Sequence, residues 1–253
     1  MEKIEAPLAL ITGGSRGLGF ETAKALRAQG FELILIAKDA DRLQLAEKEI
    51  SAAAELSAAK AITTYAVDLE NPVATSAALE KIALAHPNIT HLVLAHGVMS
   101  EKMSKTLKTT DQEWRRVMSI NLDSVFQIIN RLAPAIVDAR NGRIIIFSAC
   151  LGRMSGPGNA GGLAPYRISK AGVNALVRNL AHETGLGARG VLVDAICPNH
   201  SRTDMGGPDA PRSAAEGAET AIWLATREFG KDSDDFTKNT TGVLWEDHQI
   251  VPW

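Results

Sequence analysis

Short apolar runs and helical segments alternate along most of this chain, and no other feature of the sequence limits the fold as strongly. The apolar runs occupy residues 6–12, 31–37, 61–67, 91–95, 142–148 and 191–196. Segments with helical periodicity lie between and after them, at residues 20–29, 39–60, 73–85, 111–138 and 162–184. Buried strands that alternate with amphipathic helices form a parallel sheet with helices on both faces. No linker interrupts the alternation, so we expect one doubly wound α/β domain over residues 1–253.

The alternation ends near Pro198, where a loop rich in Gly, Pro, Asp and Arg begins. The loop covers residues 199–212, and a predicted helix at about 213–227 and a short final strand near Val243 follow it. Long loops in domains of this kind usually carry function. We therefore expect the segment at about 198–212 to contact the substrate.

Composition and charge exclude several classes of protein. The 253 residues are 45% hydrophobic with a formal net charge of −2, so the chain lacks the basic excess of nucleic-acid-binding proteins. Its apolar runs are far shorter than the about 20 residues that span a bilayer, and Thr12-Gly13-Gly14 cuts short the run that resembles a signal peptide. Cys150 and Cys197 lie in apolar contexts without metal-ligand spacing. We expect a cytoplasmic protein with two buried thiols, no metal site, and no membrane or nucleic-acid partner.

A glycine-rich turn connects the first predicted strand to the first predicted helix. Gly13, Gly17 and Gly19 have the spacing G-x-x-x-G-x-G. Without a Cβ atom, these residues let the backbone turn sharply and approach a pyrophosphate at the helix N-terminus. The spacing differs from the G-x-G-x-x-G dinucleotide motif, but it meets the same physical need at the same strand–helix junction. We therefore expect a Rossmann-type dinucleotide site at this turn.

The end of the second predicted strand indicates which dinucleotide is bound. An NAD site places a carboxylate there to bind the ribose hydroxyls, but this strand ends with Ile36-Ala37-Lys38. Lys38 and Arg16 put two cations where the 2′-phosphate of NADP would lie, and Asp39 is explained as the cap of the next helix. The sequence favours NADP(H), and NAD(H) remains the alternative.

Tyr166 and Lys170 lie four residues apart where a helical pattern begins, so they share one face of the helix. A nearby cation favours the phenolate form of tyrosine, which has an ordinary pKa of about 10. Such a pair can exchange a proton near neutral pH. In isolation, the same spacing is typical of a solvated helix face. Its place after the phosphate turn and after Ser148, at the end of a predicted strand, favours a catalytic role.

These motifs follow the order found in short-chain dehydrogenases/reductases, and the chain resembles that family over nearly its whole length. The resemblance rests on Thr12-Gly13-x3-Gly17-x-Gly19, Asp68-Leu69, Asn121, Ser148, Tyr166-x3-Lys170 and the loop after Pro198. Residues 201–207 and 241–253 further resemble carbonyl-reductase-like members. The resemblance implies a Rossmann fold and hydride transfer from a nicotinamide cofactor.

The resemblance also implies a role for each residue of the motifs. Tyr166 would act as acid and base, Ser148 would hydrogen-bond the carbonyl oxygen, and Lys170 would bind the nicotinamide ribose and lower the pKa of the tyrosine. Asn121 would hold a water molecule of the proton relay, and Asp68 would hold the adenine amino group. Cofactor contacts would come from Gly13, Ser15, Arg16, Gly17, Leu18, Gly19, Lys38, Asp68, Leu69, Gly97, Tyr166, Lys170, Pro198 and Thr203.

The sequence departs from the family pattern at three places. Residues 94–97 read Leu-Ala-His-Gly where the family commonly has Asn-Asn-Ala-Gly, and His96 is either structural or a neighbour of cofactor or substrate. Asn199 follows Pro198 where glycine is common, although asparagine also tolerates a left-handed backbone. The interval 148–166 is longer than usual and rich in glycine, and we expect it to shape the substrate entrance.

These observations predict an NADP(H)-dependent oxidoreductase that reversibly reduces small to medium, largely neutral aldehydes or ketones. The alternative is a sensor or signalling protein that binds NADP without turnover, although a sensor has no need of Ser148, Tyr166 and Lys170. The resemblance suggests a homodimer or homotetramer formed through the helices at 111–138 and 162–184. An adaptable apolar wall would come from Met99, Leu151, Met154 and Met205 if they face the pocket.

Overall fold

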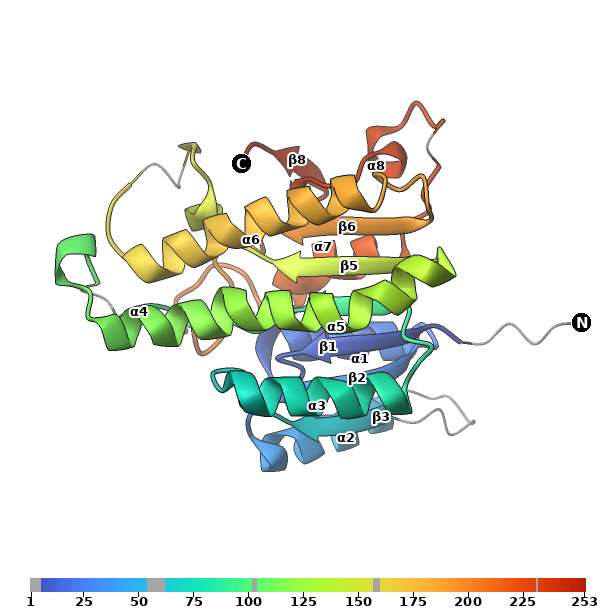
Figure 1. Ribbon diagram of the computed structural model, residues 1–253, viewed down its shortest axis with the longest axis horizontal. Helices are drawn as coiled ribbons and strands as arrows, with labels where there is room; N and C mark the ends of the chain where they lie inside the picture. The colour runs from blue at the N-terminus through green and yellow to red at the C-terminus, as the bar shows by residue number, and fades with distance from the viewer. Residues whose placement is uncertain (1–5, 54–61, 102–103, 157–159, 231) are drawn as a thin grey trace, which may run out of the picture.

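The computed structural model describes residues 6–53, 62–101, 104–156, 160–230 and 232–253. Its strands form one eight-stranded sheet in the order β3-β2-β1-β4-β5-β6-β7-β8 (Figure 1). All neighbouring pairs are parallel except β7 with β8. The strands are β1 (Leu8–Thr12), β2 (Glu32–Ala37), β3 (Ile62–Ala66), β4 (His91–Leu94), β5 (Gly142–Phe147), β6 (Val191–Ile196), β7 (Leu244–Glu246) and β8 (Gln249–Val251). The predicted doubly wound α/β fold is confirmed.

Both faces of the sheet are apolar because helices cover both of them. Successive side chains of a strand point to opposite faces, so Leu10 and Ile34 pack beneath α3, α5 and α6, whereas Ile11 and Leu35 pack beneath α1, α2 and α7. Within the described part of the chain, no helix is long and apolar enough to cross a membrane. The main helices are α1 (Gly17–Ala28), α2 (Ala40–Ala53), α3 (Pro72–Ala85), α4 (Asp111–Met118), α5 (Ser124–Ala139), α6 (Ala164–Glu183) and α7 (Ala214–Thr226).

The C-terminal part of the chain differs most from the prediction. The expected single strand near Val243 is a hairpin of β7 and β8, which turns at Asp247 and His248 with φ of 50° and 61°. Each strand has three residues, too few for an alternating pattern to be recognised. The four-residue helix α8 (Phe236–Asn239) was also not predicted. The predicted helix at 39–60 is observed as far as Ala53, and residues 54–61 lie outside the described part.

The long helix predicted at 111–138 contains a change of winding. A π-helical turn, η2 (Ser119–Asp123), separates α4 from α5. A π turn inserts an extra residue into the helix and is found often at functional sites. Here it contains Asn121, which is completely buried in a stretch that sequence periodicity predicted as ordinary α-helix. Sequence periodicity does not resolve one inserted residue in a helix of this length.

The carboxyl ends of the parallel strands meet at one edge of the sheet. Strand order reverses between β1 and β4, and ligands of open α/β sheets bind at such a switch point. The segments at 13–16, 95–98 and 148–152, which follow β1, β4 and β5, all leave the sheet at this edge. The fold therefore brings the glycine turn, His96 and Ser148 to one end of the molecule.

Candidate active site

The turn after β1 is shaped to receive an anion. Gly13 and Gly17 have φ of 68° and 57°, a left-handed backbone that favours glycine. A Cβ atom at Gly19 would lie 2.4 Å from the carbonyl oxygen of Gly13, so this glycine lets α1 pack closely on the strand end. Arg16 is the N-cap of α1 but makes no side-chain cap bond, which leaves the first helical amides for a ligand. The turn fits the pyrophosphate of a dinucleotide.

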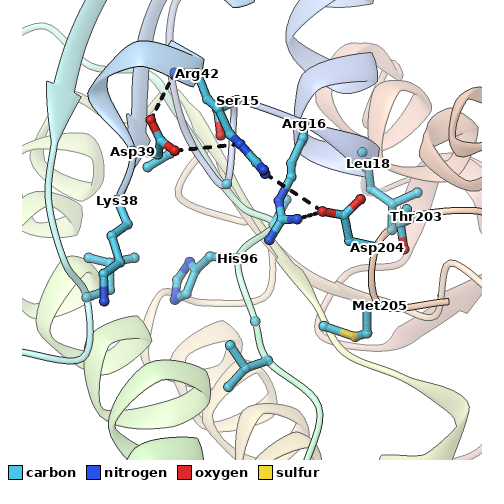
Figure 2. A pocket seen from close by; sticks show the side chains of 18 of the residues that line it. Ser15, Arg16, Leu18, Lys38, Asp39, Arg42, His96, Thr203, Asp204 and Met205 are labelled. Atoms are coloured by element: carbon cyan, nitrogen blue, oxygen red, sulfur yellow. Dashed lines mark hydrogen bonds and ion pairs between the residues drawn. The ribbon is translucent and has the colours of Figure 1, made fainter. Parts of the chain in front are cut away.

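A pocket of about 830 Å³ extends from this turn along the carboxyl edge of the sheet (Figure 2). We call it the dinucleotide pocket after the ligand that the sequence predicts. Among the predicted cofactor contacts, its lining includes Gly13, Ser15, Arg16, Gly17, Leu18, Gly19, Lys38, Asp68, Leu69, Gly97 and Thr203. The other predicted contacts, Tyr166, Lys170 and Pro198, do not line it. The volume is sufficient for a large cofactor, and the adenine-side residues expected from the sequence lie together in it.

The predicted phosphate-binding cations lie in the pocket, but each is paired with a carboxylate. Lys38 Nζ lies 2.7 Å from Asp68 Oδ2, and this contact raises the pKa of the lysine and lowers the pKa of Asp68. Arg16 forms an ion pair with Asp204. Arg42, which the sequence analysis missed, lines the same pocket at the start of α2. Its position four residues after Lys38 would have revealed it, because the first turn of α2 begins at the end of β2.

Asp39 has the capping role expected from the sequence. The backbone N–H of Arg42 donates a hydrogen bond of 3.1 Å to Asp39 Oδ1, at the start of α2. The carboxylate also lies 3.6 Å from Arg42 Nε. Asp39 therefore serves the helix and pairs with a cation, and its presence after Lys38 does not require an NAD-type ribose contact.

Tyr166 and Lys170 lie one turn apart at the start of α6, and both are buried. Leu163 precedes the helix with φ of 52°, and Pro165 lies in its first turn. The N–H of Tyr166 donates a hydrogen bond of 2.8 Å to Ser100 Oγ, which fixes the helix start against the segment after β4. Tyr166 is 6% exposed and Lys170 is 4% exposed. This pair is therefore not the solvated helix face that its spacing alone would suggest.

Lys170 carries its charge in a poorly solvated place. Its Nζ donates a hydrogen bond of 2.6 Å to the carbonyl oxygen of Phe147 at the end of β5. Burial lowers the pKa of Lys170 from 10.5 to about 8, because the charged form loses solvent. A Cβ atom at Gly97 would lie 3.4 Å from this nitrogen. Gly97 also lines the dinucleotide pocket, so it forms the boundary between that pocket and the ammonium group.

The expected lowering of the tyrosine pKa is not found. Burial raises the pKa of Tyr166 well above its ordinary value, and negative charge at the nearby sulfur pair of Cys150 and Cys197 raises it further. Desolvation outweighs any effect of Lys170, whose Nζ is directed to a backbone carbonyl instead. The phenol is therefore protonated at neutral pH, the form that donates a proton. Cys197 is buried as predicted, whereas Cys150 is half-buried beside it.

Asn121 holds the segment after β4 with both ends of its amide. Its Oδ1 accepts a hydrogen bond of 2.8 Å from the N–H of Val98, and its Nδ2 donates to the Val98 carbonyl at 2.9 Å and to Ser169 Oγ at 3.1 Å. Ser169 lies on α6 between Tyr166 and Lys170. The π turn thus lets Asn121 connect the pocket wall to the helix that carries the phenol and the ammonium. Its role toward water remains a prediction.

The Ser148 hydroxyl is directed toward α6. Its Oγ donates a hydrogen bond of 2.5 Å to Asn174 Oδ1 and lies 3.3 Å from the carbonyl oxygen of Lys170. Ser148 is 3% exposed and does not line the dinucleotide pocket. Asn174 was not predicted as part of the site, since nothing in the sequence marks a partner 26 residues away. The contact between Ser148 and a substrate carbonyl remains a prediction.

His96 braces the end of β1 against the helix around the π turn. Its Nδ1 lies 2.6 Å from Thr12 Oγ1, and its Nε2 lies 3.0 Å from the Ile120 carbonyl and 2.8 Å from Ser124 Oγ. A carbonyl oxygen only accepts, so Nε2 carries the proton and Nδ1 accepts from the threonine hydroxyl. Burial and the charge of Lys170 lower the pKa of His96 from 6.5 to about 3. The neutral ring connects β1 to the helix around the π turn, which is a structural role. His96 also lines the pocket, so its position beside a bound cofactor remains a prediction.

The loop after β6 reaches back to the glycine turn. Asn199 adopts φ of 56°, the left-handed backbone expected at this position. Thr203 packs on the turn, where a Cβ atom at Gly17 would lie 3.1 Å from Thr203 Cγ2. Of the four proposed wall residues, Met205 lines the dinucleotide pocket, whereas Met154 is 83% exposed. In the glycine-rich interval before Tyr166, residues 157–159 lie outside the described part.

Comparisons with known proteins agree with this geometry. A family model described as short chain dehydrogenase matches residues 7–213. The chain is 31% identical over 201 residues to the 3-oxoacyl-(acyl-carrier-protein) reductase FabG of Escherichia coli strain K12, covering 79% of this chain and 76% of that protein. It is 34% identical over 205 residues to the galactitol 2-dehydrogenase (L-tagatose-forming) of Cereibacter sphaeroides, covering 80% of this chain and 74% of that protein.

Solved structures of short-chain dehydrogenases also resemble this fold. A metagenomic short-chain oxidoreductase in complex with NADP superposes with a TM-score of 0.72 at 28% identity, covering 87% of this chain and 90% of that one. A short chain dehydrogenase from Shigella flexneri superposes with a TM-score of 0.78 at 20% identity, covering 94% of this chain and 89% of that one, a likeness of fold alone. The family match spans most of the sheet and the whole dinucleotide pocket except Ala214. The chain belongs to the short-chain dehydrogenase family, whose members are oxidoreductases that use a nicotinamide cofactor.

Proposed function

We propose that this protein is an NADP(H)-dependent reductase of small to medium, largely neutral aldehydes or ketones. The observation that carries the proposal is a buried phenol and a buried ammonium, Tyr166 and Lys170, one turn apart on α6. The ammonium lies beside Gly97 at the inner end of a pocket that has cations at its outer end. A bound nicotinamide would supply the hydride, and the chain would supply binding, orientation and the proton.

The proton would come from Tyr166. Hydride transfer to a carbonyl builds negative charge on oxygen, which must be neutralised by an acid. Because burial raises the pKa of Tyr166, the phenol is protonated at neutral pH and ready to donate. Lys170 is charged below about pH 8, since its pKa is lowered to about 8, and it would replenish or orient that proton. Ser148 would polarise the carbonyl after leaving Asn174.

Two observations favour NADP(H) over NAD(H). Lys38, Arg16 and Arg42 line the outer end of the pocket, where the adenosine of a dinucleotide would lie. The metagenomic relative of known structure holds NADP. Two other relatives support the proposed reaction. One is a 3-oxoacyl reductase and the other is a dehydrogenase that forms a keto sugar, so both interconvert a carbonyl and an alcohol.

We expect cytoplasmic localisation for the protein, and a homodimer or homotetramer.

The second candidate is a protein that binds NADP without turnover. The orientation of Ser148 favours it, because a hydroxyl that donates to Asn174 at 2.5 Å is not directed at a substrate. The retained phenol and ammonium favour the enzyme, since burying an ammonium is unfavourable and binding alone does not require it.

Measuring NADPH consumption over a panel of aldehydes and ketones separates these candidates. The enzyme should oxidise NADPH with at least one neutral carbonyl compound and should use NADH less well. NADPH binding without consumption across the panel would favour the sensor. Equal rates with NADH and NADPH would contradict the roles given to Lys38 and Arg16.

A further inference from the structure

The outer end of the pocket contains an acidic residue that competes with a phosphate for the same cations. Asp204 forms an ion pair with Arg16, and its Oδ2 lies 3.8 Å from Arg42 Nη1. Figure 2 shows both guanidinium groups directed toward this carboxylate. Arg16 comes from the glycine turn, and Arg42 comes from the start of α2. A single carboxylate therefore bridges the glycine turn and the start of α2, across the place where the cations would bind a phosphate.

Asp204 is held in this position by a hydrogen-bonded turn of the loop after β6. The N–H of Gly206 donates to Thr203 Oγ1 at 3.1 Å, and the N–H of Gly207 donates to the Thr203 carbonyl at 2.8 Å. Thr203 itself packs against Gly17 of the phosphate turn. The loop is thus docked beside the cation pair, and it presents the carboxylate there.

The ion pairs of Asp204 are weak enough for an anionic ligand to replace its carboxylate. The side chains of Arg16, Arg42 and Asp204 are 55%, 54% and 66% exposed, so solvent screens their attraction. A phosphate monoester carries up to two negative charges and three acceptor oxygens, and it binds guanidinium groups in a bidentate way. A carboxylate has one charge and two oxygens. A phosphate that reaches these arginines should therefore displace Asp204.

From this geometry we infer that Asp204 is a specificity-determining residue, an internal anion that must be displaced by the 2′-phosphate of NADP but not by NAD. This inference rests on the proposed function, because it takes the pocket to be the dinucleotide site. Asp204 reduces the advantage that Arg16 and Arg42 give to a 2′-phosphorylated nucleotide.

The test compares the binding of 2′,5′-ADP and 5′-AMP by isothermal titration calorimetry at low ionic strength. These probes differ only in the 2′-phosphate. In Asp204→Asn, the affinity for 2′,5′-ADP should rise about two- to fivefold, the upper part of the range for an exposed ion pair, while the affinity for 5′-AMP changes less than about 1.5-fold. Asp209→Asn is the matched control, since Asp209 is an exposed aspartate of the same loop with no ion pair among the described residues. It should leave both affinities unchanged.

An unchanged or weakened affinity of Asp204→Asn for 2′,5′-ADP would overturn the inference, as would an equal gain for both probes. The gain should disappear in an Arg16→Ala, Arg42→Ala background, and a gain that persists there would also overturn it. A wild type that binds 2′,5′-ADP no better than 5′-AMP would contradict the NADP preference of the proposed function. The effect of Asp204→Asn on 2′,5′-ADP binding still decides the inference in that case.

Discussion

The two ends of the candidate site differ in how their positive charges are solvated and paired. At the outer end, the side chains of Lys38, Arg16 and Arg42 are 71%, 55% and 54% exposed, and each is paired with a carboxylate. At the inner end, Lys170 is 4% exposed, and within the described part of the chain its Nζ donates to the carbonyl oxygen of Phe147 and has no carboxylate partner. Exposed pairs contribute little to stability, whereas a buried, unpaired ammonium is unfavourable. Substitutions at the outer end should therefore change cofactor preference with little effect on stability. At the inner end, the buried ammonium should lower the stability of the fold while it supports catalysis.

The largest effect on activity is expected at the phenol. Tyr166→Phe removes the proposed acid, so kcat should fall about 10²- to 10⁴-fold, the usual contribution of general acid catalysis. The Kd for NADPH should stay within about twofold because the hydroxyl does not line the dinucleotide pocket. Steady-state kinetics and a fluorescence titration measure the two quantities. Near wild-type turnover by this variant would contradict the role of Tyr166.

Lys170→Met should reduce activity strongly and yet stabilise the fold. Burial lowers the pKa of Lys170 from 10.5 to about 8. The unfolded chain therefore binds this proton more tightly than the folded chain does. The free energy of unfolding is lowered fully below about pH 8, and it rises with pH between about 8 and 10.5. Removing the ammonium should raise the free energy of unfolding at pH 7 by up to about 3 kcal/mol and flatten that rise.

Urea denaturation at pH 7 and pH 10 measures this change. Lys81→Met is the control, because Lys81 is exposed on α3 and should change neither value. Wild-type activity should also decline as pH rises through about 8, where Lys170 loses its proton. A destabilised Lys170→Met variant, with the same pH dependence of stability as wild type, would show that the buried ammonium is not unfavourable.

Acid should destabilise the protein through its buried, neutral histidines. Burial lowers the pKa of His96 to about 3 and that of His91 to about 4, from 6.5. As the pH falls, these histidines become protonated in the unfolded state before they do in the folded state. The free energy of unfolding is therefore highest above about pH 6.5 and falls toward pH 4, by about 1.4 kcal/mol per pH unit for each histidine. His96→Gln should make this fall shallower, although it lowers stability at pH 7 by about 1–3 kcal/mol through the lost brace.

Denaturation curves between pH 7 and 4.5 measure the slope. His182→Gln is the control, because His182 is exposed near the end of α6 and should keep the wild-type slope. If His96→Gln and His182→Gln show the same slope, the brace is not what makes the protein sensitive to acid.

The smallest effect on the fold is expected at Lys38. Lys38→Ala should weaken NADPH binding about three- to tenfold, leave NADH binding within about twofold, and change the free energy of unfolding by less than about 1 kcal/mol. Lys48→Ala, which removes an exposed lysine of α2, should leave cofactor binding unchanged. Equal weakening for NADPH and NADH would place Lys38 away from the 2′-phosphate.

The sequence predicts the outer end of the site well because its geometry is local. Gly13, Gly17 and Gly19 fulfil their roles within one turn, and Lys38 follows directly from the end of β2. The parallel sheet is predictable for the same reason, since most of its parallel strands are apolar runs of four to six residues flanked by helical patterns. The predicted final strand near Val243 corresponds to β7, whereas β8 escapes prediction because a strand of three residues has no usable period.

The inner end is less predictable because its partners are distant in the chain. Ser148 bonds to Asn174, His96 to Thr12 and Asn121 to Val98, at separations of 26, 84 and 23 residues. The pKa of Tyr166 depends on burial and on two thiols from neighbouring strand ends. Motif spacing places the phenol and the ammonium on one helix face, but it cannot indicate how deeply the rest of the fold buries them.

The most direct test of the central claim follows the hydride itself. NADPH deuterated at the transferable position of the nicotinamide is incubated with an active ketone, and the alcohol is examined by mass spectrometry. The proposed mechanism predicts one deuterium on the carbinol carbon with wild-type enzyme and almost none over the same time with Tyr166→Phe. An unlabelled alcohol from wild type, or equal labelling by both proteins, would contradict it.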